Sequence, residues 1–128
     1  MDPRPHRSAA VLGLGKSGRA AIELLLRQGF RVVAFDEKPG QAPPGVETRF
    51  GPLPADFWAG HEQVVVSPGI PLDKPELRAA RAAGAPLIGE IELAWRCLPE
   101  GTGPVLAITG TNGKSTTTAL LGELCAQG

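Results

Sequence analysis

Short apolar runs alternate with longer amphipathic stretches along the first 98 residues of the chain. The short runs predict buried parallel strands, and they lie at residues 8–12, 31–35, 46–50, 63–66 and 86–88. The longer stretches carry apolar residues at helical spacing and predict helices, at residues 17–28, 75–83 and 90–95. Strands that alternate with helices are typical of an α/β domain, in which helices flank a parallel sheet.

Apolar side chains of two predicted helices are expected to lie in the core of this domain, and a predicted turn carries two aromatic residues. In the first helix, the residues expected to face the sheet are Ala20, Ala21, Leu24 and Leu25. A predicted helical turn at residues 54–60 carries Phe57 and Trp58. In the helix at residues 90–95, the residues expected in the core are Ile91, Leu93 and Trp95.

A glycine turn of the form G-x-G-x-x-G joins the first predicted strand to the first helix. Its glycines are Gly13, Gly15 and Gly18, and the second strand closes on Asp36, about twenty residues beyond the turn. A βαβ unit with an acidic residue at this place is the arrangement of a Rossmann-like, dinucleotide-binding fold. The turn therefore predicts nucleotide binding. The alternative is that Gly13 and Gly18 only allow the helix to pack closely against the strand.

A second glycine turn, Thr-Gly-Thr-Asn-Gly-Lys-Ser-Thr, occupies residues 109–116. It lies between an apolar run at 105–108, which predicts a strand, and a predicted helix at 115–127. Backbone N–H groups in such a turn can hold a polyphosphate, while Lys114 reaches its terminal phosphates and Ser115 offers a hydroxyl to Mg²⁺. The loop is two residues shorter than the usual phosphate loop, because Ile108 stands where a glycine would be expected. A purely structural turn is the alternative.

Residues 99–104 are rich in Pro and Gly and predict a short, stiff linker. Residues 1–98 before it contain a complete set of elements for one domain. Residues 105–128 after it supply one strand, the second glycine turn and one helix, which cannot enclose a core by themselves. We therefore expect a whole first domain, followed by the start of a second α/β domain that is cut off at Gly128.

Composition narrows the range of partners. Thirteen basic and thirteen acidic residues cancel, and 5% of the residues are aromatic, so neither nucleic acid nor an anionic membrane is expected as a partner. Cys97 and Cys125 do not form a C-x-x-C pair and are expected to be buried, reduced thiols. The apolar run at residues 9–14 is too short for a signal segment or a membrane span, so we expect a cytoplasmic protein.

Two further segments, Ser-Pro-Gly-Ile-Pro at 67–71 and Gly-Glu-Ile-Glu-Leu at 89–93, complete a recognisable set with the two glycine turns. With them, the whole chain resembles the Mur ligase family, and within it the D-glutamate-adding branch. The resemblance implies a three-domain enzyme of peptidoglycan precursor synthesis. The first domain would bind the UDP end of UDP-N-acetylmuramoyl-L-alanine, the central domain ATP and Mg²⁺, and the third D-glutamate. ATP would convert the substrate carboxylate to an acyl phosphate, which the D-glutamate amine attacks to form an amide.

The resemblance also implies roles for individual residues. The UDP-substrate residues are Gly13, Gly15, Lys16, Ser17, Gly18, Asp36, Ser67 and Gly69. Lys16 and Ser17 would lie nearest the pyrophosphate, and Asp36 near the uracil. The ATP-binding residues are Gly110, Thr111, Asn112, Gly113, Lys114, Ser115 and Thr116. Lys114 is the implied catalytic residue at the β- and γ-phosphates, and Ser115 is the implied magnesium ligand.

The chain departs from the family pattern in two places. Glu37 and Lys38 follow Asp36, whereas relatives often have a Thr and then a basic residue there, so only Asp36 is assigned near the uracil. The remaining magnesium ligands, a modified lysine and the D-glutamate site would lie beyond Gly128, so we expect the chain to be inactive alone. As a separate expectation, the protein is a monomer.

Two other functions compete with the ligase. A nicotinamide-dependent oxidoreductase would use the turn at residues 13–18 and Asp36, but it leaves the second glycine turn unexplained. A non-catalytic nucleotide-binding module is the third possibility.

Overall fold

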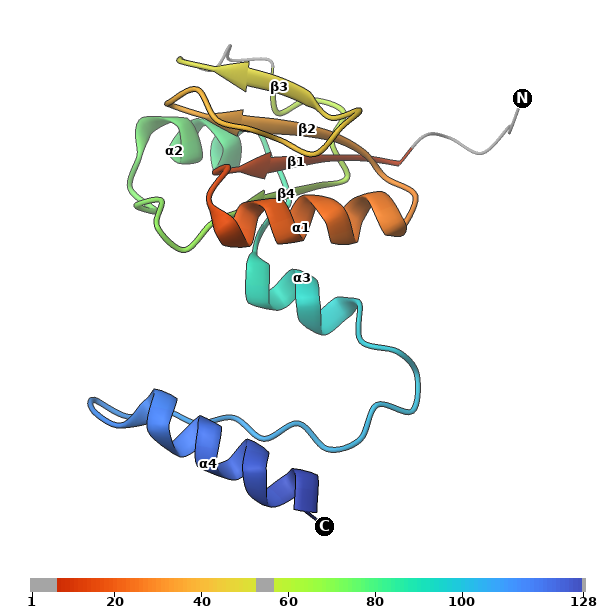
Figure 1. Cartoon of the computed structure of the whole chain (residues 1–128). Coiled ribbons are helices and arrows are strands. Elements are labelled where there is room, and N and C mark those ends of the chain that lie inside the picture. Colours follow the sequence, from red (N-terminus) through yellow and green to blue (C-terminus); the bar gives the residue numbers. More distant parts are fainter. Residues whose placement is uncertain (1–6, 53–56, 128) are drawn as a thin grey trace. The chain divides into compact units, whose positions relative to one another are not determined.

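The computed structural model describes residues 7–52 and 57–127 (Figure 1). Contacts between backbone positions divide the chain into two compact units, residues 1–98 and 99–128. The elements of the first unit are β1 (Ser8–Leu12), α1 (Lys16–Arg27), β2 (Arg31–Asp36), β3 (Glu47–Phe50), β4 (Gln63–Val66), α2 (Pro75–Ala82), β5 (Leu87–Gly89) and α3 (Glu90–Arg96). The second unit contains α4 (Lys114–Gln127).

The five strands form one parallel sheet in the order β3-β2-β1-β4-β5. The chain runs outward from β1 through β2 to β3, and then returns to the other side of β1 to place β4 and β5. The strand order therefore reverses between β1 and β4. Open α/β sheets bind ligands in the crevice at such a point, outside the carboxyl ends of the strands. This sheet, flanked by helices, confirms the predicted α/β, Rossmann-like fold class.

The central strands β1, β2 and β4 are buried on both faces of the sheet. Successive side chains of each strand point to opposite faces, so each strand contributes to two clusters. Ala9 and Val11 of β1 pack in a cluster with α1 and with Leu93 of α3. Ala10 and Leu12 pack on the other face, in a cluster with α2 and the turn that contains Phe57 and Trp58. Figure 1 shows α1 and α2 on opposite sides of the strands. These two clusters hold the carboxyl ends of β1, β2 and β4 in a fixed arrangement.

The buried face of α1 agrees only in part with the expected one, because Ala21 and Leu25 are buried but Ala20 and Leu24 are not. Its buried residues are Gly18, Ala21, Ile22 and Leu25, which follow the i, i+3, i+4, i+7 spacing of a single helical face. Ile22 is fully buried, although the sequence did not single it out. Ala20, which was expected to face the sheet, is exposed, and Leu24 is only partly buried against the cluster.

The core expected on α3 is wrong for two of its three residues. Leu93 is buried, whereas 83% of Ile91 and 58% of Trp95 are exposed. Residues two apart on an α-helix point in nearly opposite directions, so Ile91 and Trp95 cannot share the face of Leu93. The expectation had applied strand spacing to a helix.

The second unit also departs from its predicted structure. Residues 105–108 form no strand, and 52% of Val105 and 61% of Leu106 are exposed. A strand needs a neighbouring strand for its backbone hydrogen bonds, and none pairs with these residues within the described part of the chain. No described residue of α4 is buried. Whether this unit opens a further domain stays a prediction.

The two cysteines were both expected to be buried, but neither is fully buried. Cys97 is partly buried against the core, but Cys125 is exposed, because α4 has no partner surface within its unit. Residues 57–60 form a turn in which Phe57 and Trp58 are buried, while the first part of the predicted helical turn lies outside the described residues.

Membrane crossing needs about 20 residues of apolar helix. Within residues 7–52 and 57–127, no helix is both long enough and apolar enough to span a bilayer.

Candidate nucleotide-binding site

The glycine turn at residues 13–18 connects the carboxyl end of β1 to α1. The N–H of Gly13 donates to the carbonyl oxygen of Phe35 at 2.8 Å, which ties the turn to β2. Gly13 has φ +100°, in the left-handed region that a side chain would strain. A Cβ on Gly18 would lie only 1.9 Å from the carbonyl oxygen of Gly13. Close packing therefore accounts for Gly13 and Gly18.

Gly15 has a different environment from the other two glycines of the turn. No atom lies within 4 Å of the place that its Cβ would take. It is the N-cap residue of α1, and no side chain caps the helix there. The first N–H groups of an α-helix lack partners within the helix and carry a partial positive charge. Gly15, Lys16 and Ser17 are all exposed, so this end of α1 is open to an anion.

Asp36 holds the glycine turn from the end of β2. Its Oδ2 accepts a hydrogen bond from the N–H of Leu14 at 2.8 Å, and its Oδ1 accepts one from the N–H of Lys38 at 3.1 Å. Burial by itself would raise the pKa of Asp36, but hydrogen bonds from the N–H groups of Leu14, Lys38 and Glu37 outweigh it and lower the pKa. The Asp36 carboxylate is therefore hydrogen-bonded to the backbone of the glycine turn and helps to fix its conformation.

The lowered pKa of Asp36 predicts how stability depends on pH. A carboxyl whose pKa falls on folding stabilises the protein above its unfolded pKa, near 3.8, and loses this effect as the pH falls through the lower folded value. We expect the free energy of unfolding of the wild type to decrease below about pH 4 more steeply than that of Asp36→Asn. Urea unfolding at pH 7, 4 and 3 measures this. The exposed Asp73 provides a control, Asp73→Asn, and parallel profiles for wild type and Asp36→Asn would contradict the prediction.

Ser67 follows β4 and lies beside the glycine turn. Its N–H donates to the carbonyl oxygen of Leu12 at 3.0 Å, and its hydroxyl donates to Oε1 of Glu90 at 2.6 Å. A Cβ on Gly13 would lie 2.8 Å from Ser67 Oγ. The structure thus places Ser67 beside the glycine turn and joins it to Glu90, which sequence reasoning had not assigned to the site.

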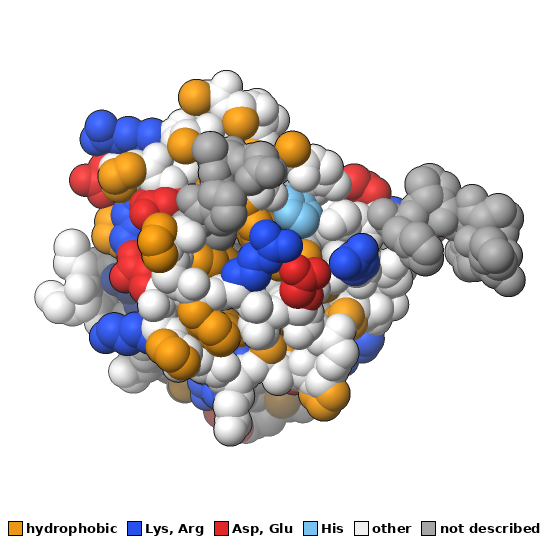
Figure 2. Space-filling model, turned by 90° about the horizontal axis from the view of Figure 1, so that it is seen from above, with side chains coloured by type: hydrophobic (Ala, Val, Ile, Leu, Met, Phe, Trp, Pro, Cys, Tyr) orange, Lys and Arg blue, Asp and Glu red, His pale blue; other side chains and the backbone are white. Residues whose placement is uncertain are grey.

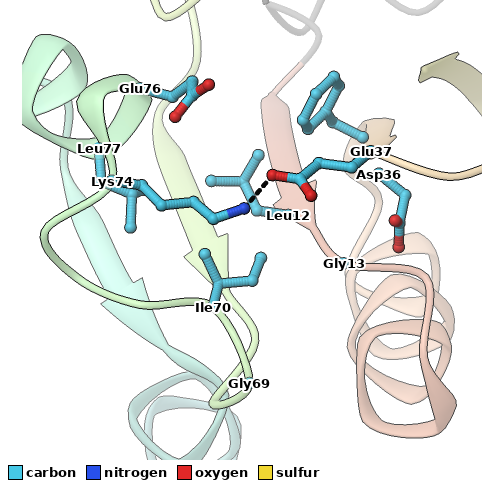
Figure 3. A pocket seen from close by; sticks show the side chains of 10 residues that line it. Leu12, Gly13, Asp36, Glu37, Gly69, Ile70, Lys74, Glu76 and Leu77 are labelled. Atoms are coloured by element: carbon cyan, nitrogen blue, oxygen red, sulfur yellow. Dashed lines mark hydrogen bonds and ion pairs between the residues drawn. The ribbon is translucent and has the colours of Figure 1, made fainter. Parts of the chain in front are cut away.

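A pocket of about 190 Å³ opens at the reversal of strand order (Figure 3). Its wall includes Gly13, Asp36 and Gly69, three of the residues assigned to the UDP substrate. Drug-sized ligands fill pockets of about 300–1,000 Å³. The smaller pocket here suits one part of a nucleotide, while the open end of α1 remains for the rest.

An ion pair crosses this pocket. Lys74, at the start of α2, reaches Oε1 of Glu37, which follows β2 (Figure 3). This hydrogen bond to Glu37 raises the pKa of Lys74. Sequence reasoning had not assigned Lys74 to the site. The signal available was its position in a Pro-rich segment after β4, at the sheet edge where ligands bind.

Another pocket, with a polar lining, lies at the amino ends of the strands. It is lined by residues that include Ser8, Arg31, Glu47, Arg49 and His61, and Figure 2 shows basic and acidic side chains around the histidine. Glu47 pairs with Arg31 at 3.4 Å and with Arg49 at 2.8 Å, and His61 Nδ1 lies 2.9 Å from Ser8 Oγ. These groups satisfy one another, and parallel sheets bind ligands at their carboxyl ends, so this pocket is not our candidate site.

The second glycine turn belongs to the second unit, residues 99–128. All seven positions that follow Thr109 in the turn are glycine or polar and are exposed. Lys114 Nζ donates to the carbonyl oxygen of Gly110 at 2.6 Å. Gly113 has φ +75°, which favours glycine there. Lys114 and Ser115 begin α4. An exposed lysine and a hydroxyl at the start of a helix suit a phosphate chain.

Comparison with known proteins agrees with this geometry. Residues 7–89 match the family model described as "Mur ligase MurD-like, N-terminal domain". The chain is also similar to three proteins named UDP-N-acetylmuramoylalanine--D-glutamate ligase. The one from Myxococcus xanthus is 51% identical over 127 residues, which cover 92% of this chain and 28% of the relative.

The relative from Anaeromyxobacter dehalogenans is 48% identical over 126 residues, covering 91% of this chain and 27% of that protein. The relative from Koribacter versatilis is 41% identical over 137 residues, covering 100% of this chain and 29% of that protein. The chain thus spans less than a third of the length of these relatives. The family model covers more than half of the chain, from β1 to β5. The chain therefore belongs to the Mur ligase family, and residues 7–89 form its MurD-like N-terminal domain.

Proposed function

We propose that the chain is the nucleotide-binding part of an ATP-dependent ligase that adds D-glutamate to UDP-N-acetylmuramoyl-L-alanine in cytoplasmic peptidoglycan precursor synthesis. The observation that carries the proposal is the meeting of the glycine turn, Asp36 and Ser67 at the reversal of strand order, in a domain that matches the MurD-like family. The names of the similar ligases support the same substrate.

The first unit would bind the UDP end of the substrate. The pyrophosphate would lie at the open start of α1, where Gly15 lets the ligand approach the backbone and Lys16 and Ser17 are exposed. The pocket behind Gly13, Asp36 and Gly69 would take the nucleoside. Asp36 already accepts two backbone N–H groups, so its main task in this proposal is to hold the turn.

The second unit would contribute to the ATP site. The N–H groups of residues 110–116 would surround the phosphates, and Ser115 would give its hydroxyl to Mg²⁺, which neutralises phosphate charge when bound. Lys114 would move from the carbonyl oxygen of Gly110, where it lies at 2.6 Å, to the β- and γ-phosphates. Transfer of the γ-phosphoryl group from ATP to the substrate carboxylate would give the acyl phosphate and ADP. Attack by the D-glutamate amine on the acyl carbon would then form the amide and release phosphate. Charge neutralisation matters more for such a transfer than acid–base groups do.

Calorimetric titration of the 128-residue chain with UDP-N-acetylmuramoyl-L-alanine, UDP and NAD tests the first half of this proposal. We expect binding of the two uridine nucleotides and a preference for them over NAD. Gly15→Val is expected to abolish binding without unfolding the chain, because its side chain would block the backbone from the pyrophosphate.

The matched control for this titration is Gly103→Val. Gly103 also has open space around its Cβ position and lies in the second unit, so Gly103→Val should bind like the wild type. An intact chain that binds no uridine nucleotide at millimolar concentration would contradict the proposal. A preference for NAD would instead favour the oxidoreductase alternative, and nucleotide binding without ligase activity in a full-length protein would favour a non-catalytic module.

A further inference from the structure

The side chain of Glu90 is joined to the candidate site through a single short hydrogen bond. Glu90 is the first residue of α3 and follows β5, whose neighbour in the sheet is β4. The hydroxyl of Ser67, just after β4, donates to Glu90 Oε1 at 2.6 Å. Hydrogen bonds of 2.5–2.7 Å are typical of a hydroxyl that donates to a carboxylate, and they are stronger than bonds between neutral groups. The orientation of the Ser67 hydroxyl is therefore fixed by Glu90.

Ser67 in turn fills the space beside the glycine turn. A Cβ on Gly13 would lie 2.8 Å from Ser67 Oγ, and a Cβ on Gly18 would lie 3.2 Å from it. The Ser67 hydroxyl thus occupies the space that a side chain at Gly13 or Gly18 would need. The same hydroxyl is hydrogen-bonded to Glu90, so Ser67 lies between Glu90 and the glycine turn.

We propose that Glu90 is a positioning residue for the uridine nucleotide, an inference that rests on the proposed function of the first unit. A serine hydroxyl has one hydrogen to donate and two lone pairs to accept with. Its hydrogen is donated to Glu90, so Ser67 can only accept a hydrogen bond from a ligand. It would accept from an O–H or N–H group of the ligand, such as a sugar hydroxyl, and cannot donate to an oxygen of the ionised pyrophosphate. The phosphates are left to the backbone N–H groups of the turn and of α1.

Glu92 offers a matched control on the same helix. It also lies in the first turn of α3, so any effect of negative charge on the helix dipole is shared by both residues. Glu92 instead pairs with Arg96 at 2.7 Å, and both side chains are about half exposed. Of these two glutamates, Glu90 is the one that bonds to a residue beside the glycine turn.

The test is calorimetric titration of the 128-residue chain with UDP-N-acetylmuramoyl-L-alanine. We expect Glu90→Ala to weaken binding about three- to tenfold, the effect of losing one hydrogen bond. Glu90→Gln keeps an oxygen acceptor for Ser67 and should bind within about twofold of the wild type, as should Glu92→Ala. In a Ser67→Ala background, Glu90→Ala should have no further effect, because the residue through which it acts is gone.

Wild-type affinity in Glu90→Ala would overturn the proposal. So would an equal loss in the presence and absence of the Ser67 hydroxyl, since Glu90 would then act by another route. If Glu90→Ala does not fold, Glu90→Met removes the acceptor and keeps the length of the side chain.

A second measurement separates this inference from the proposed function. In the free chain, the backbone amide resonances of Gly13 and Gly18 should shift in Glu90→Ala and not in Glu92→Ala. Failure of the wild type to bind any uridine nucleotide would contradict the proposed function. Unchanged Gly13 and Gly18 resonances would by themselves overturn the positioning role.

Discussion

Gly18→Ala is expected to destabilise the first unit by about 3 kcal/mol or more, which is the upper range for forcing extra atoms into a packed site. The added Cβ would lie 1.9 Å from the carbonyl oxygen of Gly13, and that oxygen belongs to the backbone and cannot rotate away. In an exposed helix the same substitution would stabilise by about 1 kcal/mol, because alanine is the better helix former. At Gly18 the overlap is the larger effect, so the sign is reversed.

Urea unfolding followed by circular dichroism measures this difference. Gly15→Ala is the control within the same turn, since nothing lies within 4 Å of its Cβ position, and its cost should stay within about 1 kcal/mol. A single domain is stable by only about 5–15 kcal/mol, so Gly18→Ala should lower the midpoint clearly. A Gly18→Ala chain as stable as Gly15→Ala would mean that the turn can relax, and that Gly18 is not required for packing.

The glycine turn was predicted from the sequence, but the separate roles of its glycines were not. The G-x-G-x-x-G pattern and Asp36 predicted the turn, its place between β1 and α1, and a nucleotide site. The pattern could not separate the packing roles of Gly13 and Gly18 from the open position of Gly15. That distinction depends on distances between the turn, Ser67 and the first turn of α1, which only the folded backbone defines.

Strands with a strong local signal were predicted well. The runs that became β1, β2 and β4 are apolar on both faces and end at glycine, aspartate or serine, so their bounds could be predicted within a residue. The strand order could not, because it depends on the long return from β3 to β4. The ion pair between Glu37 and Lys74 depends on the same return. No local pattern connects two residues that far apart in the sequence.

Residues 105–108 show the opposite case, in which a good local pattern did not produce the element. The run is apolar and follows a proline, yet it forms no strand. Three of its four residues are exposed, and Ile108 is partly buried. Backbone pairing requires neighbours, and the described residues supply none there. The same absence of neighbours leaves Leu120 and Leu124 of α4 about 60% exposed, although the helix itself was predicted correctly.

Lys114→Ala is expected to lower ligase activity by about 100-fold or more, the loss seen when one preorganised group that stabilises transition-state charge is removed. The assay needs a protein of the full length of the relatives. A chimera in which this chain replaces the matching segment of the Myxococcus xanthus ligase, 51% identical to it, provides one. In the chimera, Lys114 would leave the carbonyl oxygen of Gly110 and neutralise the γ-phosphoryl group during its transfer.

The rate of ADP release in the presence of both other substrates measures this effect. Arg27→Ala removes an exposed cation from α1 and should leave the rate unchanged. A chimera that is active with Lys114→Ala would show that Lys114 does not carry the charge neutralisation.

The 128-residue chain should bind ATP far more weakly than the chimera. Its turn at 109–113 is exposed, and no strand at 105–108 fixes it. The start of α4 contributes only about 0.3–1 kcal/mol toward an anion at an exposed helix end, which by itself corresponds to less than a tenfold gain in affinity. Titration of the chain with ATP and Mg²⁺ should therefore give no binding at micromolar concentration. Micromolar affinity would mean that contacts within these residues already hold the turn in its binding conformation.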